Sequence, residues 1–437
     1  MNYTIIPLPK SEVEISVEIP FVEFEPYVKR AAVLISEAHD VKGFRRGKAP
    51  YPVVRDRFGE SAIYERAADM AVRRTYPEAL ERLIASSQLP ADRPPLGQPE
   101  ITVMKLAAGD ALEYKVELAL LPEVTLPEGY RGTAREILKK EHRELVVSEE
   151  EVTKALSWLQ ESRTKLVNVD RPAAKGDAVE VDFEVLHAGV LLEGGVSKNH
   201  PLVLGKEKFL PGFEDQLIGM RRGEERAFML VAPHEWHEKT FAGKALDFKV
   251  AMQLVEERQV PELDDAFAKN VGNFSSLEAF RESIRQGIAE EKREKEKQRI
   301  RGLVAEAIAH NASLEIPEVL VHGELKKMIE ELRGSLEGVG MQWEAYLTEI
   351  KKTIEDLMKE WRDEAIRRVR IALCLREIAR REKIEPTEEE IKKAVDQYLN
   401  RYRRLKEAER AIDPRVLEEY TRGILKNEKV FEFLEAA

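Results

Sequence analysis

Alternating apolar and polar residues mark the first part of the chain. In residues 11–19 every second side chain is Val or Ile and its neighbours are polar, which is typical of a half-buried strand. Strands are expected in three segments, residues 11–19, 101–105 and 112–121. Apolar residues at helical spacing predict helices over two segments, residues 23–38 and 51–86. Residues 88–99 contain four prolines and are expected to be irregular. The pattern indicates an α+β domain over residues 1–118.

The pattern changes at residues 119–149, which show no helical period and contain prolines and glycines. We expect an extended connector there. Ser148 and Glu151 have the spacing of a capping box, in which each side chain accepts a hydrogen bond from the backbone N–H of the other residue. A helix is therefore expected to begin at this point.

Strand signals dominate between residues 176 and 257. Val179, Val181, Phe183 and Val185 alternate with acidic residues, and glycines supply turns between successive strands. These features predict a compact antiparallel β domain that, together with the preceding helix, spans residues 150–257.

Residues 258–437 lack this alternation and predict an all-α domain. Long helices are expected over five segments, residues 275–312, 317–336, 342–384, 387–411 and 414–435. Their expected starts are capping boxes at Ser275–Glu278 and Thr387–Glu390, and Asp413 before Pro414. The charged run Glu290–Arg301 is expected to be a solvated helix face with ion pairs four residues apart. The predicted fold class of the whole chain is multidomain α+β.

Charge and cysteine content limit the possible functions. The chain has 70 Lys and Arg against 81 Asp and Glu, a net charge of −11, which disfavours an RNA-binding assembly factor because such proteins are normally basic. Cys374 is the single cysteine, so intrachain disulfides and Cys-based zinc sites are excluded, and its apolar neighbours predict a buried thiol. No apolar run is long enough for a membrane helix, and the first residues lack a secretory pattern. We therefore expect a cytoplasmic protein.

The sharpest short motif is a loop rich in glycine and cations. Between Lys42 and Arg57 the chain has six positive residues and one negative residue. The motif reads Gly43, Phe44, Arg45, Arg46, Gly47, Lys48, Ala49, Pro50. Such a loop is suited to present cations to phosphates or acidic side chains while the aromatic ring enters an apolar pocket. The alternative is a solvated turn with Phe44 in the core.

This motif resembles the ribosome-docking signature of the bacterial trigger factor family, Gly-Phe-Arg-x-Gly-x-x-Pro. Residues 204–215, Leu-Gly-Lys-Glu-Lys-Phe-Leu-Pro-Gly-Phe-Glu-Asp, resemble a segment of FK506-binding-protein-type peptidyl-prolyl isomerases. The order of tip, connector, isomerase domain and helical tail resembles the family over the whole chain. The resemblance implies ribosome binding through seven residues of the motif, Gly43, Phe44, Arg45, Arg46, Gly47, Lys48 and Pro50.

The resemblance also implies an isomerase pocket. Its residues would be Phe183, Leu192, Glu193, Phe209, Leu210, Phe213, Trp236 and Phe248. Rotation of an X–Pro bond meets a barrier of ~18–20 kcal/mol, and an apolar cup that excludes water lowers it without a nucleophile or metal. The family usually has Phe at Leu192 and Thr-Gly at Glu184-Val185, so we predict weak to moderate activity. The alternative for all these residues is ordinary core packing.

As a whole, the resemblance implies an ATP-independent, ribosome-associated chaperone that shields nascent chains and isomerises X–Pro bonds. It implies three partners, the large ribosomal subunit at the nascent-chain exit through protein and rRNA, unfolded nascent polypeptides, and a second copy in a homodimer off the ribosome. No cofactor, metal or membrane is implied, and no Walker loop occurs. The helical tail has more apolar residues than one packing seam needs, and we expect some to line a cradle. The alternatives are a stand-alone isomerase with helical substrate-adaptor regions and a periplasmic chaperone-isomerase, which would need a signal peptide.

Overall fold

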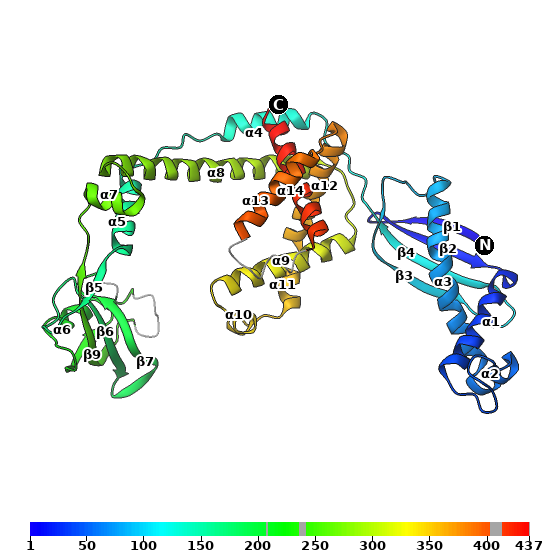
Figure 1. Ribbon diagram of the computed structural model, residues 1–437, viewed down its shortest axis with the longest axis horizontal. Coiled ribbons are helices and arrows are strands. Elements are labelled where there is room, and N and C mark those ends of the chain that lie inside the picture. Colours follow the sequence, from blue (N-terminus) through cyan, green and yellow to red (C-terminus); the bar gives the residue numbers. More distant parts are fainter. Residues whose placement is uncertain (207–208, 236–241, 403–412, 437) are drawn as a thin grey trace. The chain divides into compact units, whose positions relative to one another are not determined.

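The computed structural model describes residues 1–206, 209–235, 242–402 and 413–436 (Figure 1). It divides into two compact units, one of Met1–His142 and Lys297–Ala437 and the other of Arg143–Glu296. Among the described helices, none is both long and apolar enough to span a membrane. The β domain expected over residues 150–257 therefore lies entirely in the second unit.

The first unit begins with a four-stranded antiparallel sheet in the order β1-β2-β4-β3. The strands are β1 (Asn2–Leu8), β2 (Glu12–Ile19), β3 (Pro95–Lys105) and β4 (Leu112–Leu120). Three helices accompany them, α1 (Phe21–Ala38), α2 (Tyr51–Phe58) and α3 (Glu60–Ala85). Ile15 and Tyr114 point from the sheet into a cluster that Phe24 and Ile63 enter from the helices. The alternation in residues 11–19 is thereby confirmed as one buried and one polar face.

Three details of this region were wrong in the sequence-based interpretation. Strand β1 was missed because it is an edge strand with no buried side chain and with a proline at Pro7. The helix expected over residues 51–86 is two helices, since Gly59 has φ +87° and ends the first one. Strand β3 begins at Pro95 within the segment expected to be irregular, because an edge strand tolerates the missing N–H of proline.

The second unit contains a five-stranded antiparallel sheet. Its path is β5-β9-β6-β7, and β8 pairs with β9. The elements are β5 (Lys165–Asn168), β6 (Ala178–His187), β7 (Val190–Val203), α6 (Phe213–Leu217), β8 (Glu225–Val231) and β9 (Ala245–Gln259). Val179, Val181 and Phe183 are buried on one face of β6, as their alternation predicts. The first residue of β5, Lys165, pairs with the last residue of β9, Gln259, so the chain enters and leaves this sheet at neighbouring points.

Three helices complete the second unit, α5 (Glu149–Ser162), α7 (Asp265–Gly272) and the first part of α8 (Leu277–Asn311). Val152 and Leu156 of α5 share a buried cluster with Phe267 and Phe280. Helix α5 therefore packs on α7 and α8.

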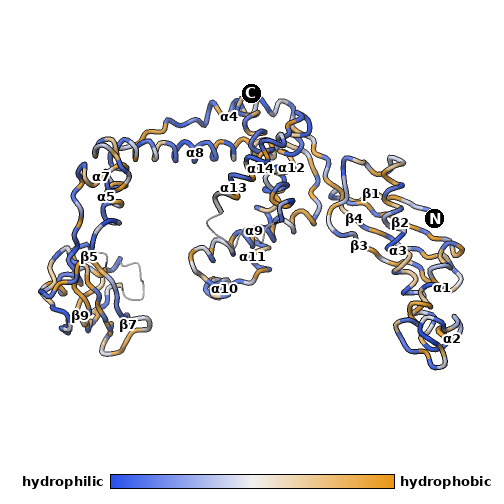
Figure 2. Tube along the Cα trace, in the orientation of Figure 1, coloured by the Kyte–Doolittle hydropathy of each residue, from blue (hydrophilic) through white to orange (hydrophobic). Residues whose placement is uncertain are grey.

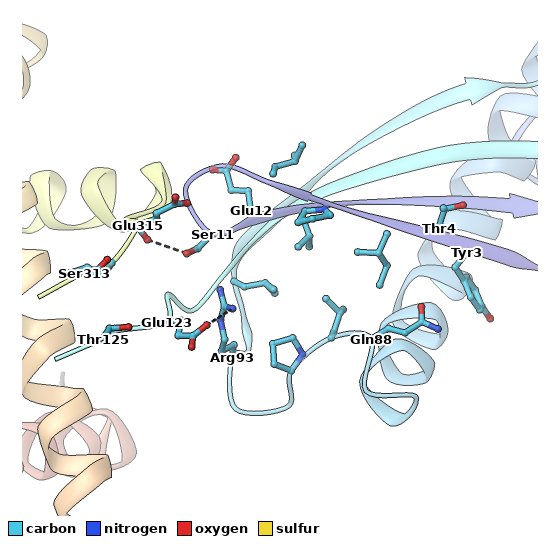
Figure 3. Close-up of a pocket in the computed structure, with 18 residues that line it drawn as sticks. Tyr3, Thr4, Ser11, Glu12, Gln88, Arg93, Glu123, Thr125, Ser313 and Glu315 are labelled. Atoms are coloured by element: carbon cyan, nitrogen blue, oxygen red, sulfur yellow. Dashed lines mark hydrogen bonds and ion pairs between the residues drawn. The ribbon is translucent and has the colours of Figure 1, made fainter. Parts of the chain in front are cut away.

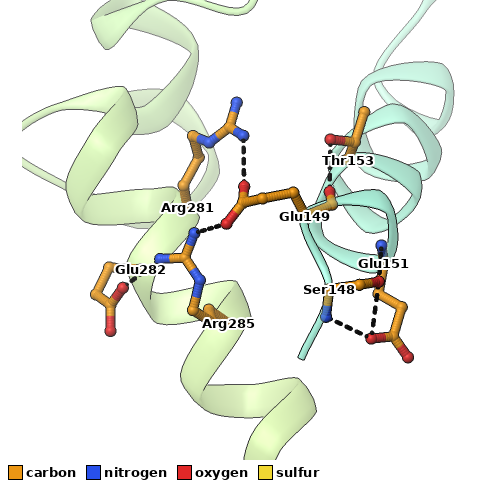
Figure 4. Close-up of polar contacts among 7 residues, drawn as sticks. All are labelled: Ser148, Glu149, Glu151, Thr153, Arg281, Glu282 and Arg285. Atoms are coloured by element: carbon orange, nitrogen blue, oxygen red, sulfur yellow. Dashed lines mark hydrogen bonds and ion pairs between the residues drawn. The ribbon is translucent and has the colours of Figure 1, made fainter. Parts of the chain in front are cut away.

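The start of α5 is fixed by local hydrogen bonds (Figure 4). Glu151 N–H donates to Ser148 Oγ at 3.3 Å, and Ser148 N–H donates to Glu151 Oε2 at 2.8 Å. The predicted capping box is confirmed. Glu149 lies beside Arg281 and Arg285 of α8, whose guanidinium groups hold the pKa of its carboxyl below the usual range.

The described remainder of the first unit is helical, as predicted for residues 258–437. It contains part of α8 together with α4 (Tyr130–Glu141), α9 (Glu318–Gly338), α10 (Trp343–Ile350), α11 (Ile354–Glu360), α12 (Arg362–Glu382), α13 (Glu388–Tyr402) and α14 (Pro414–Glu435). Glu390 N–H donates to Thr387 Oγ1 at 3.3 Å, which confirms the capping box, and Arg415 N–H donates to the Asp413 carboxylate at 2.9 Å. Part of the helix expected over residues 387–411 lies outside the described residues. The multidomain α+β class is confirmed.

Helix α4 corrects the expectation of an extended connector over residues 119–149. Tyr130 and Ala134 are buried in a cluster with Ile308 of α8 and Val430 of α14. Tyr130 Oη also donates to the Glu382 carboxylate of α12. The helix is stabilised by helices far away in sequence. The sequence-based interpretation missed the helical spacing of its apolar residues, Tyr130, Ala134, Ile137 and Leu138.

Two helix boundaries also needed correction. The single helix expected over residues 342–384 is three helices, because Lys351 adopts φ +54° and Thr353 then caps α11 through Asp356. At the start of α8, Ser276 rather than Ser275 accepts the capping hydrogen bond, from Ala279 N–H at 3.2 Å.

The charged run on α8 is only partly a solvated face. Figure 2 shows hydrophilic and hydrophobic positions mixed along this helix. Lys295 pairs with Glu291 within the helix, as expected. Arg301, in contrast, is 4% exposed and pairs with Glu428 and Glu435 of α14. The prediction of a solvated face is wrong for this end of the run.

Within the first unit, the β1–β2 turn contacts the chain leading into α9 (Figure 3). Ser11 Oγ donates to the Glu315 carbonyl at 3.1 Å, and Lys10 Nζ lies 2.7 Å from Glu318 Oε1. Arg362 and Lys10 lower the pKa of Glu318 to about 2. A cavity of about 910 Å³ lies beside these contacts, between the ends of the sheet and residues 313–315.

Candidate functional sites

The loop after α1 is held by its backbone and two buried anchors. Val41 and Ala49 are buried at its ends. Gly47 N–H donates to the Ser36 carbonyl at 3.0 Å, and Lys48 N–H to the Arg45 carbonyl at 2.9 Å. Gly47 has φ +73°, and a Cβ there would lie 2.6 Å from Glu37 Cγ, so glycine is required. The loop is therefore an ordered tip.

The side chains at this tip point to solvent. Phe44 is 42% exposed, so it does not lie in the core, and Arg45 and Lys48 are exposed without a side-chain partner in the described part of the chain. Arg46 pairs with Asp40 at 2.9 Å, and this contact lowers the pKa of Asp40. The tip thus presents one aromatic ring and two unpaired cations.

In the second unit, four of the predicted pocket residues form one aromatic cluster. Phe183 of β6 lies 5.3 Å from Phe209, and Phe213 of α6 lies 4.3 Å from Phe209 and 5.1 Å from Phe248 of β9, between ring centroids. Phe213 is fully buried, and Phe209 is half-buried. The cluster therefore has one ring at a partly open position and the others beneath it.

The remaining predicted residues have different outcomes. Leu210 is buried in the same cluster, and Leu192 packs against it while half-buried. Glu193 lies in β7, but its side chain is outside the described residues, and Trp236 is outside them entirely. Glu184 and Val185 stand where isomerases of the FK506-binding-protein type usually have Thr-Gly. Glu184 is exposed and Val185 is buried.

The sequence-based interpretation missed two rings of this cluster, Phe228 and His200. Phe228 of β8 stacks on Phe248 with centroids 5.6 Å apart. His200 of β7 contacts Phe183 at 5.3 Å and Phe209 at 5.6 Å, both edge-on. For Phe228 the sequence has no alternation of polarity, since its neighbours Ala227 and Met229 are also apolar, and only the structure shows that Phe228 is the less exposed. His200 lies where the β6–β7 register is irregular, and its sequence gives no signal either.

An apolar site of this kind has one evident use in chemistry. Phenyl rings cannot act as acid, base or nucleophile, but they can displace water from an amide. In a less polar surrounding the amide loses part of its charge-separated resonance form, and rotation about its C–N bond becomes easier.

Helix α14 carries an exposed apolar stripe that was also missed. Val416, Tyr420 and Ile424 are 60%, 59% and 51% exposed, at a spacing of four residues. The spacing could have been read from the sequence, but only the structure separates this face from the buried one at Leu417 and Thr421. The stripe is a candidate surface for apolar chain segments.

Comparison with known protein families covers most of the chain. The model for bacterial trigger factor protein matches residues 1–159, and that for the trigger factor C-terminus matches residues 276–436. Between them, the model for FKBP-type peptidyl-prolyl cis-trans isomerase matches residues 169–253.

Curated relatives agree with this. The trigger factor of Caldicellulosiruptor bescii is 34% identical over 388 residues, covering 89% of this chain and 85% of the relative. The trigger factor of Moorella thermoacetica is 33% identical over 404 residues, covering 92% and 87%. A solved structure of the trigger factor chaperone aligns over 99% of both chains at 22% identity with a TM-score of 0.49. The chain belongs to the bacterial trigger factor family of chaperones, with an FKBP-type peptidyl-prolyl isomerase domain.

Proposed function

We propose that this chaperone works at the ribosome, docking through the tip at residues 43–50. The docking site would be the large ribosomal subunit at the nascent-chain exit, with contacts to ribosomal protein and rRNA. Its clients would be unfolded nascent polypeptides, held without nucleotide hydrolysis, and off the ribosome the protein would form a homodimer. The compartment would be the cytoplasm.

One observation carries the docking proposal, the exposure of Phe44 on the same loop as two unpaired cations, Arg45 and Lys48. An aromatic ring that is 42% exposed on an ordered loop is available for a pocket on a partner. Arg45 and Lys48 are available for phosphates or acidic side chains, and such contacts weaken with salt. The residues proposed to dock are Gly43, Phe44, Arg45, Arg46, Gly47, Lys48 and Pro50.

The test is cosedimentation with large ribosomal subunits at low salt. A variant with Phe44, Arg45 and Arg46 replaced by Ala should stay in the supernatant with an unchanged thermal melt, because an exposed loop supports little core. As a matched control, Arg73→Ala with Arg74→Ala removes two exposed arginines of α3 and should leave binding intact. Unchanged cosedimentation of the triple variant would overturn the docking proposal.

We further infer that the aromatic cluster is the isomerase site. Its residues would be Phe183, Leu192, Glu193, Phe209, Leu210, Phe213, Trp236 and Phe248. Half-buried Phe209 supports the inference, because it is the ring that a bound proline can reach above Phe213. With Leu192 in place of an aromatic ring, activity would be weak to moderate.

The proposed division of labour follows four regions. Residues 1–118 would dock, 119–149 would connect through α4, 150–257 would isomerise, and 258–437 would hold clients. The exposed stripe of Val416, Tyr420 and Ile424 supports the last assignment, since holding an unfolded chain requires accessible apolar area. Leu325 and Leu373, in contrast, are buried between helices and are not available to clients.

A further inference from the structure

Strand β1 forms one edge of the sheet in the first unit. It pairs with β2 on one side, and no strand in the described part of the chain lies on its other side. Pro7 has no N–H, and a proline in an edge strand has its nitrogen facing away from the sheet. Alternate residues of an antiparallel strand share one orientation, so the N–H and C=O groups of Tyr3 and Ile5 also face outward. Within the described residues these groups make no hydrogen bond, and they form an open edge.

The cavity of about 910 Å³ lies beside this strand (Figure 3). Strand β1 lines it from Tyr3 to Leu8, a stretch of about 17 Å at ~3.4 Å per residue. The segment after α3, residues 88–93, lines it as well. Its apolar lining includes half-buried Ile5 and buried Leu89. The cavity therefore has the length of a short extended segment and offers apolar surface next to unpaired backbone groups.

The charged residues that line the cavity are mainly acidic. Among the described lining residues there is one cation, Arg93, and it lies 3.7 Å from the Glu123 carboxylate. Glu315 accepts a hydrogen bond from the Lys10 N–H at 2.7 Å. Glu12, which is half-buried, has no partner in the part of the chain that the structure describes. The cavity therefore has three carboxylates against one guanidinium group, which favours an occupant with basic side chains.

We propose that β1 and this cavity bind an extended segment of unfolded polypeptide as an added strand, with apolar residues alternating with Lys or Arg. The proposal rests on the proposed holding of unfolded chains and adds a second holding site, within residues 1–118. Hydrogen bonds to the backbone of Tyr3 and Ile5 require an extended chain but no particular sequence, which suits varied clients. Successive side chains of a strand point to opposite faces, so the apolar set can enter the cavity while the basic set stays near its carboxylates.

The probe is a fluorophore-labelled octapeptide in which Val alternates with Lys. Methylation of the backbone nitrogen of each Lys leaves one hydrogen-bonding edge, at the Val residues, and prevents the peptide from stacking into sheets with itself. Fluorescence anisotropy with the full chain should show saturable binding of this probe. A control peptide with the same side chains and every backbone nitrogen methylated should bind at least about tenfold more weakly, because it can donate no hydrogen bond to β1.

Ile5→Pro blocks the open edge of β1. It removes an outward N–H and places a ring where the added strand would lie, while the pairing with β2 does not use this N–H. Binding of the probe should weaken at least about fivefold. Ile5→Val is the matched control, because it retains the N–H and a branched side chain, and it should bind as the wild type does. Glu12→Gln removes one carboxylate from the cavity and should make binding weaker and less dependent on salt.

Hydrogen exchange in the wild-type chain gives a second readout that needs no variant. The probe should slow amide exchange in residues 2–8, and this result decides the matter if Ile5→Pro does not fold. Equal binding to Ile5→Pro and Ile5→Val, without protection of β1, overturns the inference. Protection that follows protein concentration instead of the probe also overturns it, because the occupant is then a second copy. In both cases suppression of client aggregation by the wild type leaves the proposed holding function in place. Absence of both probe binding and suppression removes both proposals.

Discussion

The chemistry of single side chains in this protein depends on their exposure to solvent. Phe44 and Cys374 are opposite cases, the first 42% and the second 2% exposed. Cys374 lies on α12 in a cluster with residues of α4, α8 and α14. Burial raises the pKa of its thiol to about 11, because the thiolate would lose its hydration.

We therefore expect Cys374 to be inert in the folded protein. With a free thiol pKa of about 8.5, a pKa near 11 lowers the thiolate fraction at pH 8 by a factor on the order of 10². A chromogenic disulfide reagent should therefore react with Cys374 at least on the order of 10² times faster in guanidinium, where the protein is unfolded, than in buffer. Equal rates in the two conditions would mean that the thiol is accessible.

At the scale of elements, the ends of helices are decided by a few hydrogen bonds. The start of α5 combines the Ser148–Glu151 capping box with Glu149 beside Arg281 and Arg285 of α8 (Figure 4). The cap orders the first turn, and the neighbouring arginines connect it to another helix.

Replacing Ser148 by Ala should loosen the first turn of α5. Loss of an N-cap hydroxyl costs about 1 kcal/mol, which corresponds to roughly fivefold faster amide exchange. Hydrogen exchange measured by mass spectrometry on peptides of α5 would report it. Thr153→Ala is the control, because the Thr153 hydroxyl donates to the Glu149 carbonyl inside the helix and caps nothing. Equal exchange in both variants would contradict the role of the cap.

At the scale of the whole molecule, the β sheet of the second unit is an insertion with adjacent ends. Lys165 and Gln259 are paired at its base, and α5 packs on α7 and α8 through a separate cluster. The sheet can therefore be removed without opening that cluster. This makes the two proposed activities separable by experiment.

We predict that holding of unfolded chains survives removal of the isomerase sheet. A variant with residues 165–259 replaced by a short Gly/Ser bridge should still suppress aggregation of a refolding client, since holding scales with apolar area at roughly 25 cal/mol per Å². Deleting residues 262–437 should largely abolish suppression. Replacing Val416, Tyr420 and Ile424 by Ser is a milder variant that keeps the helices and should weaken it. The opposite pattern would favour a stand-alone isomerase.

The sequence by itself determined the features that depend on near neighbours. Alternation in residues 11–19 and 179–185 predicted strands, and side chains next to helix starts predicted the caps at Ser148, Thr387 and Asp413. These succeed because a strand face or a helix cap is defined within about four residues. The grouping of the aromatic residues into one site was predicted only through resemblance to a family.

The tertiary structure alone decided what depends on distant partners. Helix α4 exists because Tyr130 is buried and bonded to Glu382, 252 residues away. Arg301 is buried because α14 supplies two carboxylates, and His200 joins the aromatic cluster because β6 lies beside β7. In each case the free energy comes from burial and pairing between segments that sequence periodicity cannot bring together.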